Sequence, residues 1–231
     1  MPATSGFVNR EDMFFVSHFW RSSHHPDPDG QYLRLNQEGL RVQRWSYIWV
    51  DWTCMPQSPR KPEEDAYFVR ALETMSALIR NCGFMWFYPP FEPRLWILYE
   101  VTEYYLTCDQ DLVSTDDNEQ YVTHNREMLQ LGVRPVLWKH HYRCTNHLDQ
   151  AFLTSWLEVL ILLTKLGLHI VDVRHMLDNL SWLARGEVYI HLTYRGGTLS
   201  IDKFKGTLSL EEKDFTFTPF PKWGTSALAL D

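Results

Sequence analysis

The sequence predicts an α/β fold in which a parallel sheet is flanked by helices and followed by a C-terminal extension. Two observations predict it. A short apolar segment precedes a helix-like segment three times within the first half of the chain, the pattern of a parallel sheet with right-handed crossovers. The last third instead combines a long apolar helix pattern with alternating segments around Gly196 and Gly197, which predict a β-hairpin.

The elements of the first half follow from apolar spacing. The predicted strands are short, aromatic and β-branched, and the predicted helices place apolar residues three or four positions apart. Gly83 follows the second helix, as glycines often do at helix ends. We predict strands at 13–19, 44–51, 84–88 and 134–138, helices at 31–42, 66–80 and 95–106, and loops at 53–65 and 109–120.

The second half is expected to pack on the first as one compact unit. A long, mostly buried helix is predicted at 148–166, with Asn146 or Thr145 as its N-cap. A shorter helix at 175–183 precedes the hairpin, and the segments GTLSL and FTFTPFP predict one or two more strands. We place the α/β domain at 10–145 and the helical and hairpin extension at 146–231.

Composition excludes several function classes. The chain of 231 residues is 45% hydrophobic, which is enough for a substantial core. Its net charge of -7, without a Lys/Arg cluster, argues against nucleic-acid binding, because phosphate backbones need clustered positive charge. The longest apolar stretch contains Glu158 and Lys165, so we expect no membrane partner. Four widely spaced cysteines and no visible secretory signal favour a cytoplasmic protein.

Three segments of the first half resemble the Toll/interleukin-1 receptor (TIR) domain family, and more closely a divergent TIR-like group. FFVSHFW (14–20) is similar to the first strand of that family. YIWVDWTCMPQ (47–57) is similar to the second strand and the loop that guards the site. YPPFEPRLWILYE (88–100) is similar to the stretch in which a Trp precedes a Glu by four residues. An HPDPDG insertion, and Ile97 where a Cys is common, depart from the family pattern.

The resemblance, which covers about residues 10–140, implies a flavodoxin-like sheet and a catalytic carboxylate, Glu100, beside the ribose of NAD+. One acid suffices to cleave the bond to nicotinamide, because nicotinamide leaves as a neutral ring and the carboxylate stabilises an oxocarbenium-like ribose. The resemblance therefore implies an NAD+ hydrolase or cyclase that takes NAD+ as substrate and needs no cofactor. Glu103, one turn further on, is the alternative acid. A simpler interpretation makes Glu100 a first-turn helix acid stabilised by the helix dipole.

Side chains at the ends of the first two strands are expected to line the substrate site. Open α/β sheets bind ligands at the carboxyl ends of their strands, and aromatic rings there can stack on a flat base. The loop from Trp52 to Gln57 is expected to close over that base. Local hydrogen bonds to the backbone are the simpler role for the hydroxyl and imidazole groups. The predicted substrate-binding residues are Ser17, His18, Trp20, Asp51, Trp52, Tyr88 and Trp96.

Two histidine-rich segments suggest a metal, but we predict no metal site. HHPDPDG (24–30) has the composition of a turn and needs no ion. KHHYRCTNH (139–147) offers histidine and cysteine ligands, yet no second cluster completes a zinc pattern. We expect a loop that leads into the long helix.

Other functions stay open at this point, because a fold does not fix a function. One is a non-catalytic TIR-like interaction module whose loops bind partner domains. Others are a nucleoside deoxyribosyltransferase-like enzyme, and a nucleotide sensor whose C-terminal hairpin region binds the ligand. The family resemblance also implies activity as a homo-oligomer, in which a loop of one protomer completes the next site, and a role in immunity or cell death.

Overall fold

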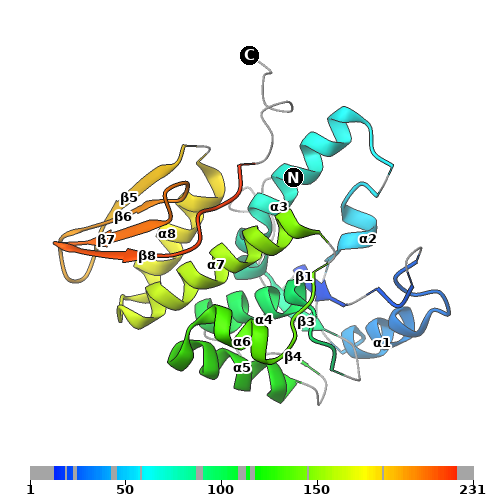
Figure 1. Cartoon of the computed structure of the whole chain (residues 1–231). Coiled ribbons are helices and arrows are strands. Elements are labelled where there is room, and N and C mark those ends of the chain that lie inside the picture. The colour runs from blue at the N-terminus through cyan, green and yellow to red at the C-terminus, as the bar shows by residue number, and fades with distance from the viewer. Residues whose placement is uncertain are drawn as a thin grey trace.

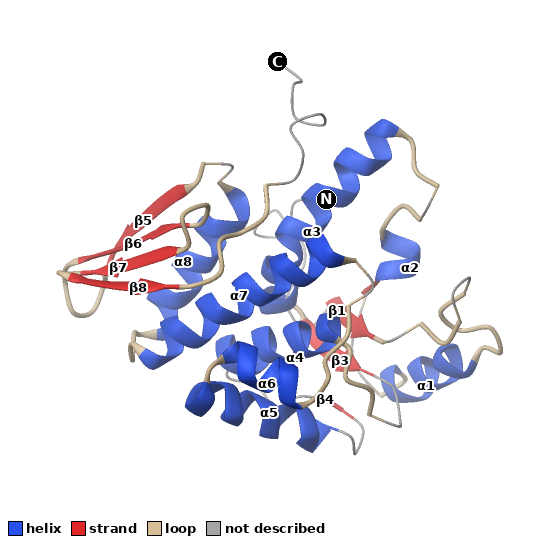
Figure 2. Cartoon of the chain, viewed as in Figure 1, coloured by secondary structure: helices blue, strands red, loops and turns tan. Residues whose placement is uncertain are grey.

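The computed structural model describes most of the chain and shows a mixed α/β fold. The described part contains eight helices, a parallel sheet and a C-terminal antiparallel sheet (Figures 1 and 2). The described residues are 13–18, 20–22, 25–42, 46–57, 59–86, 91–108, 113–114, 118–144, 146–183 and 185–222.

The parallel sheet has the strand order β2-β1-β3-β4, with β1 (Met13–Ser17) inside it. Phe14 of β1 pairs with Ile48 of β2 on one side and with Gly83 of β3 on the other. A Cβ at Gly83 would lie 2.7 Å from the Phe14 ring, so the close approach of these strands requires glycine. The other strands are β2 (Tyr47–Val50), β3 (Gly83–Trp86) and β4 (Val113–Ser114).

Helices connect these strands, which confirms the predicted repeat of strand and helix. Their bounds are α1 (Gln31–Leu40), α2 (Asp51–Cys54), α3 (Pro62–Asn81) and α4 (Leu95–Thr107). The predicted loop at 53–65 is wrong at both ends, since α2 occupies its start and α3 its end. Pro62 suits the first turn of α3, and the Glu64 carboxylate accepts a hydrogen bond of 2.8 Å from the Lys61 backbone amide.

The predicted strand at 134–138 is also wrong, because these residues belong to helix α6 (Val133–Lys139). Pro135 lies in the first turn of α6, where its missing N–H group would have no intrahelical acceptor. Helix α5 (Asn118–Leu131), which the pattern did not indicate, precedes α6, and Gly132 separates the two helices with a φ of 88°.

The C-terminal half begins with α7 (His147–Lys165) and α8 (Ile170–Trp182). The predicted cap of α7 is confirmed, since the Asn146 side chain accepts a hydrogen bond of 2.9 Å from the Leu148 amide. The hairpin is confirmed too, and it extends into a four-stranded antiparallel sheet. Its strands are β5 (Glu187–His191), β6 (Thr198–Asp202), β7 (Thr207–Leu210) and β8 (Lys213–Thr216).

One hydrophobic core runs through both halves. Helix α4 packs against α7, α3 packs against α8, and α8 packs against β5 of the antiparallel sheet (Figure 1). Phe15, Leu98 and Leu157 belong to the same cluster of buried side chains, although they come from β1, α4 and α7. Within the described residues, no helix combines the length and the apolar character needed to cross a membrane.

Candidate functional site

Polar and aromatic side chains meet where β1 and β2 end. Ser17 is the last residue of β1 and Asp51 follows β2 directly, so the parallel pairing of these strands brings the two residues to one edge. The Ser17 hydroxyl donates a hydrogen bond to Oε2 of Glu100 on α4. The Trp20 indole donates one of 3.0 Å to Oδ2 of Asp51. We call Ser17, His18, Trp20, Asp51, Trp52 and Glu100 the edge cluster.

Aromatic rings form the outer part of the edge cluster. Trp20 packs edge-on against Trp52, with ring centroids 4.9 Å apart, and His25 lies 5.3 Å from Trp52. Tyr32 of α1 lies against His18 at 5.3 Å. Sequence reasoning missed His25 and Tyr32, because only the fold of the segment after β1 brings them back to the strand end.

Glu100 is the buried acid of this cluster. It is the sixth residue of α4, beyond the first turn, so the simple interpretation as a dipole-stabilised first-turn acid is wrong. Only 9% of the residue is exposed, and burial raises the pKa of Glu100 to about 8, although the hydrogen bond from Ser17 opposes the shift. The carboxyl group is therefore mostly protonated at neutral pH in the free protein.

His18 contributes a buried polar atom to the edge cluster. Its side chain is 5% exposed, and Nε2 lies 3.6 Å from Oδ1 of Asp51. Within the described part of the chain, Nδ1 has no hydrogen-bond partner. Burial lowers the pKa of His18, while the nearby charges of Asp51 and Asp27 partly oppose that shift. The edge cluster thus contains a neutral imidazole whose Nδ1 has no hydrogen-bond partner among the described residues.

Glu103, the alternative acid, has a different environment. It is fully buried and forms an ion pair with Arg80, with Nη1 and Oε1 2.6 Å apart. Ser76 and the Trp156 indole donate further hydrogen bonds of 2.9 and 2.6 Å to its carboxylate. Because Arg80 also pairs with Asp178, this network joins α3, α4, α7 and α8. Both carboxylate oxygens of Glu103 therefore already accept hydrogen bonds from neighbouring helices, which gives this residue a structural role.

The remaining predicted residues are placed less favourably. Tyr88 lies outside the described residues. Trp96 is one turn before Glu100, but it hydrogen-bonds to Asp149 and packs on Tyr99, 5.9 Å away. The structure therefore does not join Trp96 to the edge cluster through any of these contacts. The predicted loop from Trp52 begins as helix α2, and the Gln57 amide folds back to donate to the backbone oxygen of Asp51 at 3.2 Å.

The two histidine-rich segments have local partners. The Asp27 carboxylate accepts hydrogen bonds from the Tyr32 and Leu33 amides at the start of α1, and Asp29 pairs with Arg21. His140 pairs with Glu127 at 2.7 Å. Within the part of the chain that the structure describes, no group of three or more His, Cys, Asp or Glu side chains could hold a metal ion.

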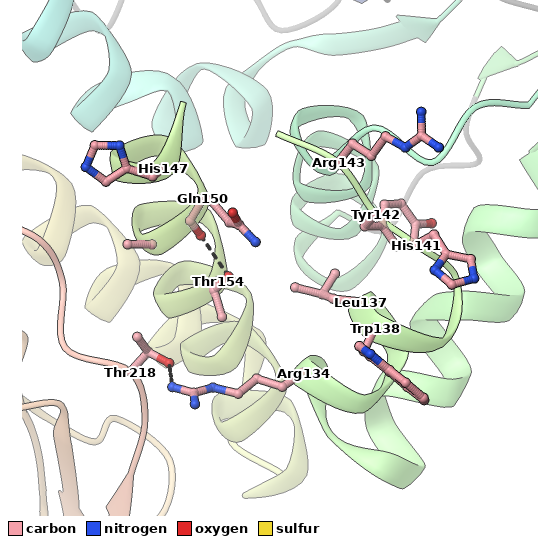
Figure 3. A pocket seen from close by; sticks show the side chains of 11 residues that line it. Arg134, Leu137, Trp138, His141, Tyr142, Arg143, His147, Gln150, Thr154 and Thr218 are labelled. Carbon is pink, nitrogen blue, oxygen red and sulfur yellow. Dashed lines mark hydrogen bonds between the residues drawn. The ribbon is translucent and has the colours of Figure 1, made fainter. Parts of the chain in front are cut away.

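A cavity of about 690 Å³ lies between α6 and α7 (Figure 3) and shares no lining residue with the edge cluster. Comparisons of the protein with family models, with curated proteins and with solved structures give no match.

Proposed function

We propose that this protein is an NAD+ hydrolase or cyclase with a TIR-type, flavodoxin-like sheet. The observation that carries the proposal is the hydrogen bond from Ser17 to Glu100 at the carboxyl end of β1. The order β2-β1-β3-β4 supports it, because in flavodoxin-like sheets the order of strand addition changes direction between β1 and β3, and ligands bind at that switch point. Four of the predicted binding residues surround this point, namely His18, Trp20, Asp51 and Trp52.

The environment of Glu100 suits a cationic substrate. A carboxyl group with a pKa of about 8 ionises readily when a positive charge approaches, and the nicotinamide ring of NAD+ carries that charge. As the bond between C1′ and the ring nitrogen breaks, its electron pair leaves with nicotinamide and the positive charge moves to the ribose. A carboxylate in a site with little water stabilises that charge strongly, and the Ser17 hydroxyl holds its orientation.

The other residues of the edge cluster would bind the rest of the substrate. Trp20 and Trp52 are half-buried indoles that offer faces for stacking on nicotinamide or adenine. Asp51 would accept hydrogen bonds from the ribose hydroxyls. Water then adds to C1′ and releases a proton in hydrolysis, whereas an adenine nitrogen of the same molecule adds in cyclisation. We further propose that the active form is a homo-oligomer, as the TIR resemblance implies.

The test is release of free nicotinamide from NAD+ at high protein concentration. Glu100→Gln replaces a mostly protonated acid with a neutral group of similar shape, so the fold should persist while activity falls about a hundredfold to a thousandfold. Glu119→Gln, at an exposed position of α5, is the matched control and should keep full activity.

Three results would contradict the proposal. Equal nicotinamide release by wild type and Glu100→Gln would remove Glu100 from catalysis. A well-folded, concentrated protein that releases no nicotinamide would favour the non-catalytic interaction module instead. Exchange of free bases into deoxynucleosides would indicate the deoxyribosyltransferase-like enzyme.

A further inference from the structure

The cavity between α6 and α7 has the size of a small-molecule site. Its volume of about 690 Å³ falls within the range typical of ligand pockets. Figure 3 shows Gln150 and Thr154 on the α7 wall and Leu137 on the α6 wall, while Arg134 reaches across one end toward Thr218. The cavity thus has an apolar and hydrogen-bonding interior between two helices.

The rim of the cavity is basic in a protein of net charge -7. Arg134, His141, Arg143 and His147 line it, and none of the eleven described lining residues is a carboxylate. Glu158 balances Arg134, with Nε and Oε1 3.1 Å apart. Arg143 forms no ion pair among the described residues. Arg143 is therefore the source of uncompensated positive charge among the described lining residues, and this charge favours an anionic ligand.

Trp138 adds a flat ring to the same rim. It is 82% exposed, the largest value among the exposed large hydrophobic side chains of the described part. Indole rings stack on nucleic-acid bases regardless of their sequence, because every base has a π-face. The exposed indole could stack on the base of a nucleotide, while the positive charge of Arg143 attracts its phosphates.

His141 lines the cavity from an unfavourable backbone conformation. The His141 amide donates to the Trp138 carbonyl at 3.2 Å and the Tyr142 amide to the Leu137 carbonyl at 3.0 Å, which is the Schellman arrangement at the end of α6. The residue in this position has a φ of 53° and is usually glycine. The protein therefore accepts local strain where it places an imidazole at the cavity.

We propose that this cavity is a nucleotide-binding site separate from the edge cluster. The phosphates lie against Arg143 and His141, and the base stacks on Trp138. Gln150 and Thr154 offer an amide and a hydroxyl to the sugar. Binding at this cavity does not involve Glu100, so it can be tested independently of the proposed NAD+ chemistry.

The experiment is titration of the full chain, in the Glu100→Gln background, with ATP, adenosine and inorganic tripolyphosphate. This background weakens any contribution of the edge cluster. ATP should bind about tenfold more tightly than either of its parts, since it uses both the rim charges and the indole. Trp138→Ala and Arg143→Ala should each raise the Kd for ATP by about fivefold or more. The matched controls Trp182→Ala and Arg126→Ala, at exposed positions outside the cavity, should leave Kd unchanged.

His141→Gly separates binding from folding. Glycine relieves the left-handed strain, so the variant should keep or raise Tm while it weakens ATP binding. Absence of ATP binding would overturn the proposal, as would wild-type Kd values in both Trp138→Ala and Arg143→Ala. Equal affinity for ATP and tripolyphosphate would overturn the assignment to nucleotides, because the base would then contribute nothing.

Discussion

The hydroxyl of Ser17, the last residue of β1, donates a hydrogen bond to the carboxyl group of Glu100 on α4, 83 positions later in the chain. This contact places a buried titratable acid at the carboxyl end of a parallel sheet. Burial raises the pKa of Glu100 to about 8. At neutral pH the folded protein therefore keeps a proton on Glu100 that a glutamate exposed to water would have lost. Both the stability and the proposed activity should therefore depend on pH.

Glu100→Gln should stabilise the protein at alkaline pH. The folded state keeps a proton on Glu100 up to about pH 8, whereas the unfolded state loses it near the ordinary value of 4.5. The stability that comes from this proton is complete below about pH 4.5 and is lost as pH rises through 8. The advantage of the Gln variant in urea unfolding should thus grow between about pH 5 and 9 to a few kcal/mol. A constant difference across that range would contradict the raised pKa.

Nicotinamide release should rise with pH if the carboxylate form of Glu100 is the active one. Below the pKa of about 8, kcat/KM for NAD+ should increase about tenfold per pH unit and then level off. The measurement is a pH series of initial rates at NAD+ concentrations well below KM. Glu119→Gln should show the same profile as wild type. A profile that is flat between pH 6 and 9 would show that Glu100 does not control the rate.

Glu103→Gln should destabilise the protein severely. The change leaves the fully buried Arg80 with a neutral partner on α4, and breaking a buried pair in this way costs about 3–5 kcal/mol. Asp178→Asn should cost much less, because the Asp178 side chain is 43% exposed and water can replace it. Urea unfolding measures both. Equal losses in the two variants would mean that the Arg80 charge is not isolated from solvent.

His124 should make the protein less stable in mild acid. Burial, followed by the nearby His140, lowers the pKa of His124 to about 4, while the unfolded value is near 6.5. The unfolded state therefore binds the proton first, so stability falls as pH drops from about 6.5 toward 4. Thermal unfolding of His124→Gln should show a weaker loss over this window. His141→Gln, at an exposed position, is the control and should follow wild type.

Most residues of the edge cluster could be predicted from the sequence, because they follow two apolar segments that are recognisable as strands. Strands β1 and β2 are short apolar runs, and their carboxyl ends meet wherever the strands pair in parallel. Ser17 and Asp51 could therefore be placed together without knowing any side-chain contact. The choice between Glu100 and Glu103 could not be made this way, because it depends on Arg80 and Trp156, which are distant in sequence.

Helix α6 shows why other elements escaped prediction. Its segment, RPVLW, contains the β-branched Val136 and the aromatic Trp138, which favour a strand on local propensity, and a proline, which is rare inside a helix. The structure instead uses Pro135 in a first helical turn and packs the helix between α5 and α7. The cavity beside α6 could not be predicted for a similar reason. It depends on contacts between residues far apart in the sequence, such as the hydrogen bond between Arg134 and Thr218, which are 84 positions apart.

The network around Arg80 and Glu103 limits how this protein can be cut or fused. Arg80 and Glu103 come from α3 and α4, but their partners Trp156 and Asp178 come from α7 and α8. A fragment that stops before α7 would keep Arg80 and Glu103 but lose Trp156 and Asp178, and it would expose core side chains around the remaining pair. Attempts to produce the sheet alone, or to graft it into another protein, should therefore retain the chain through its last described strand.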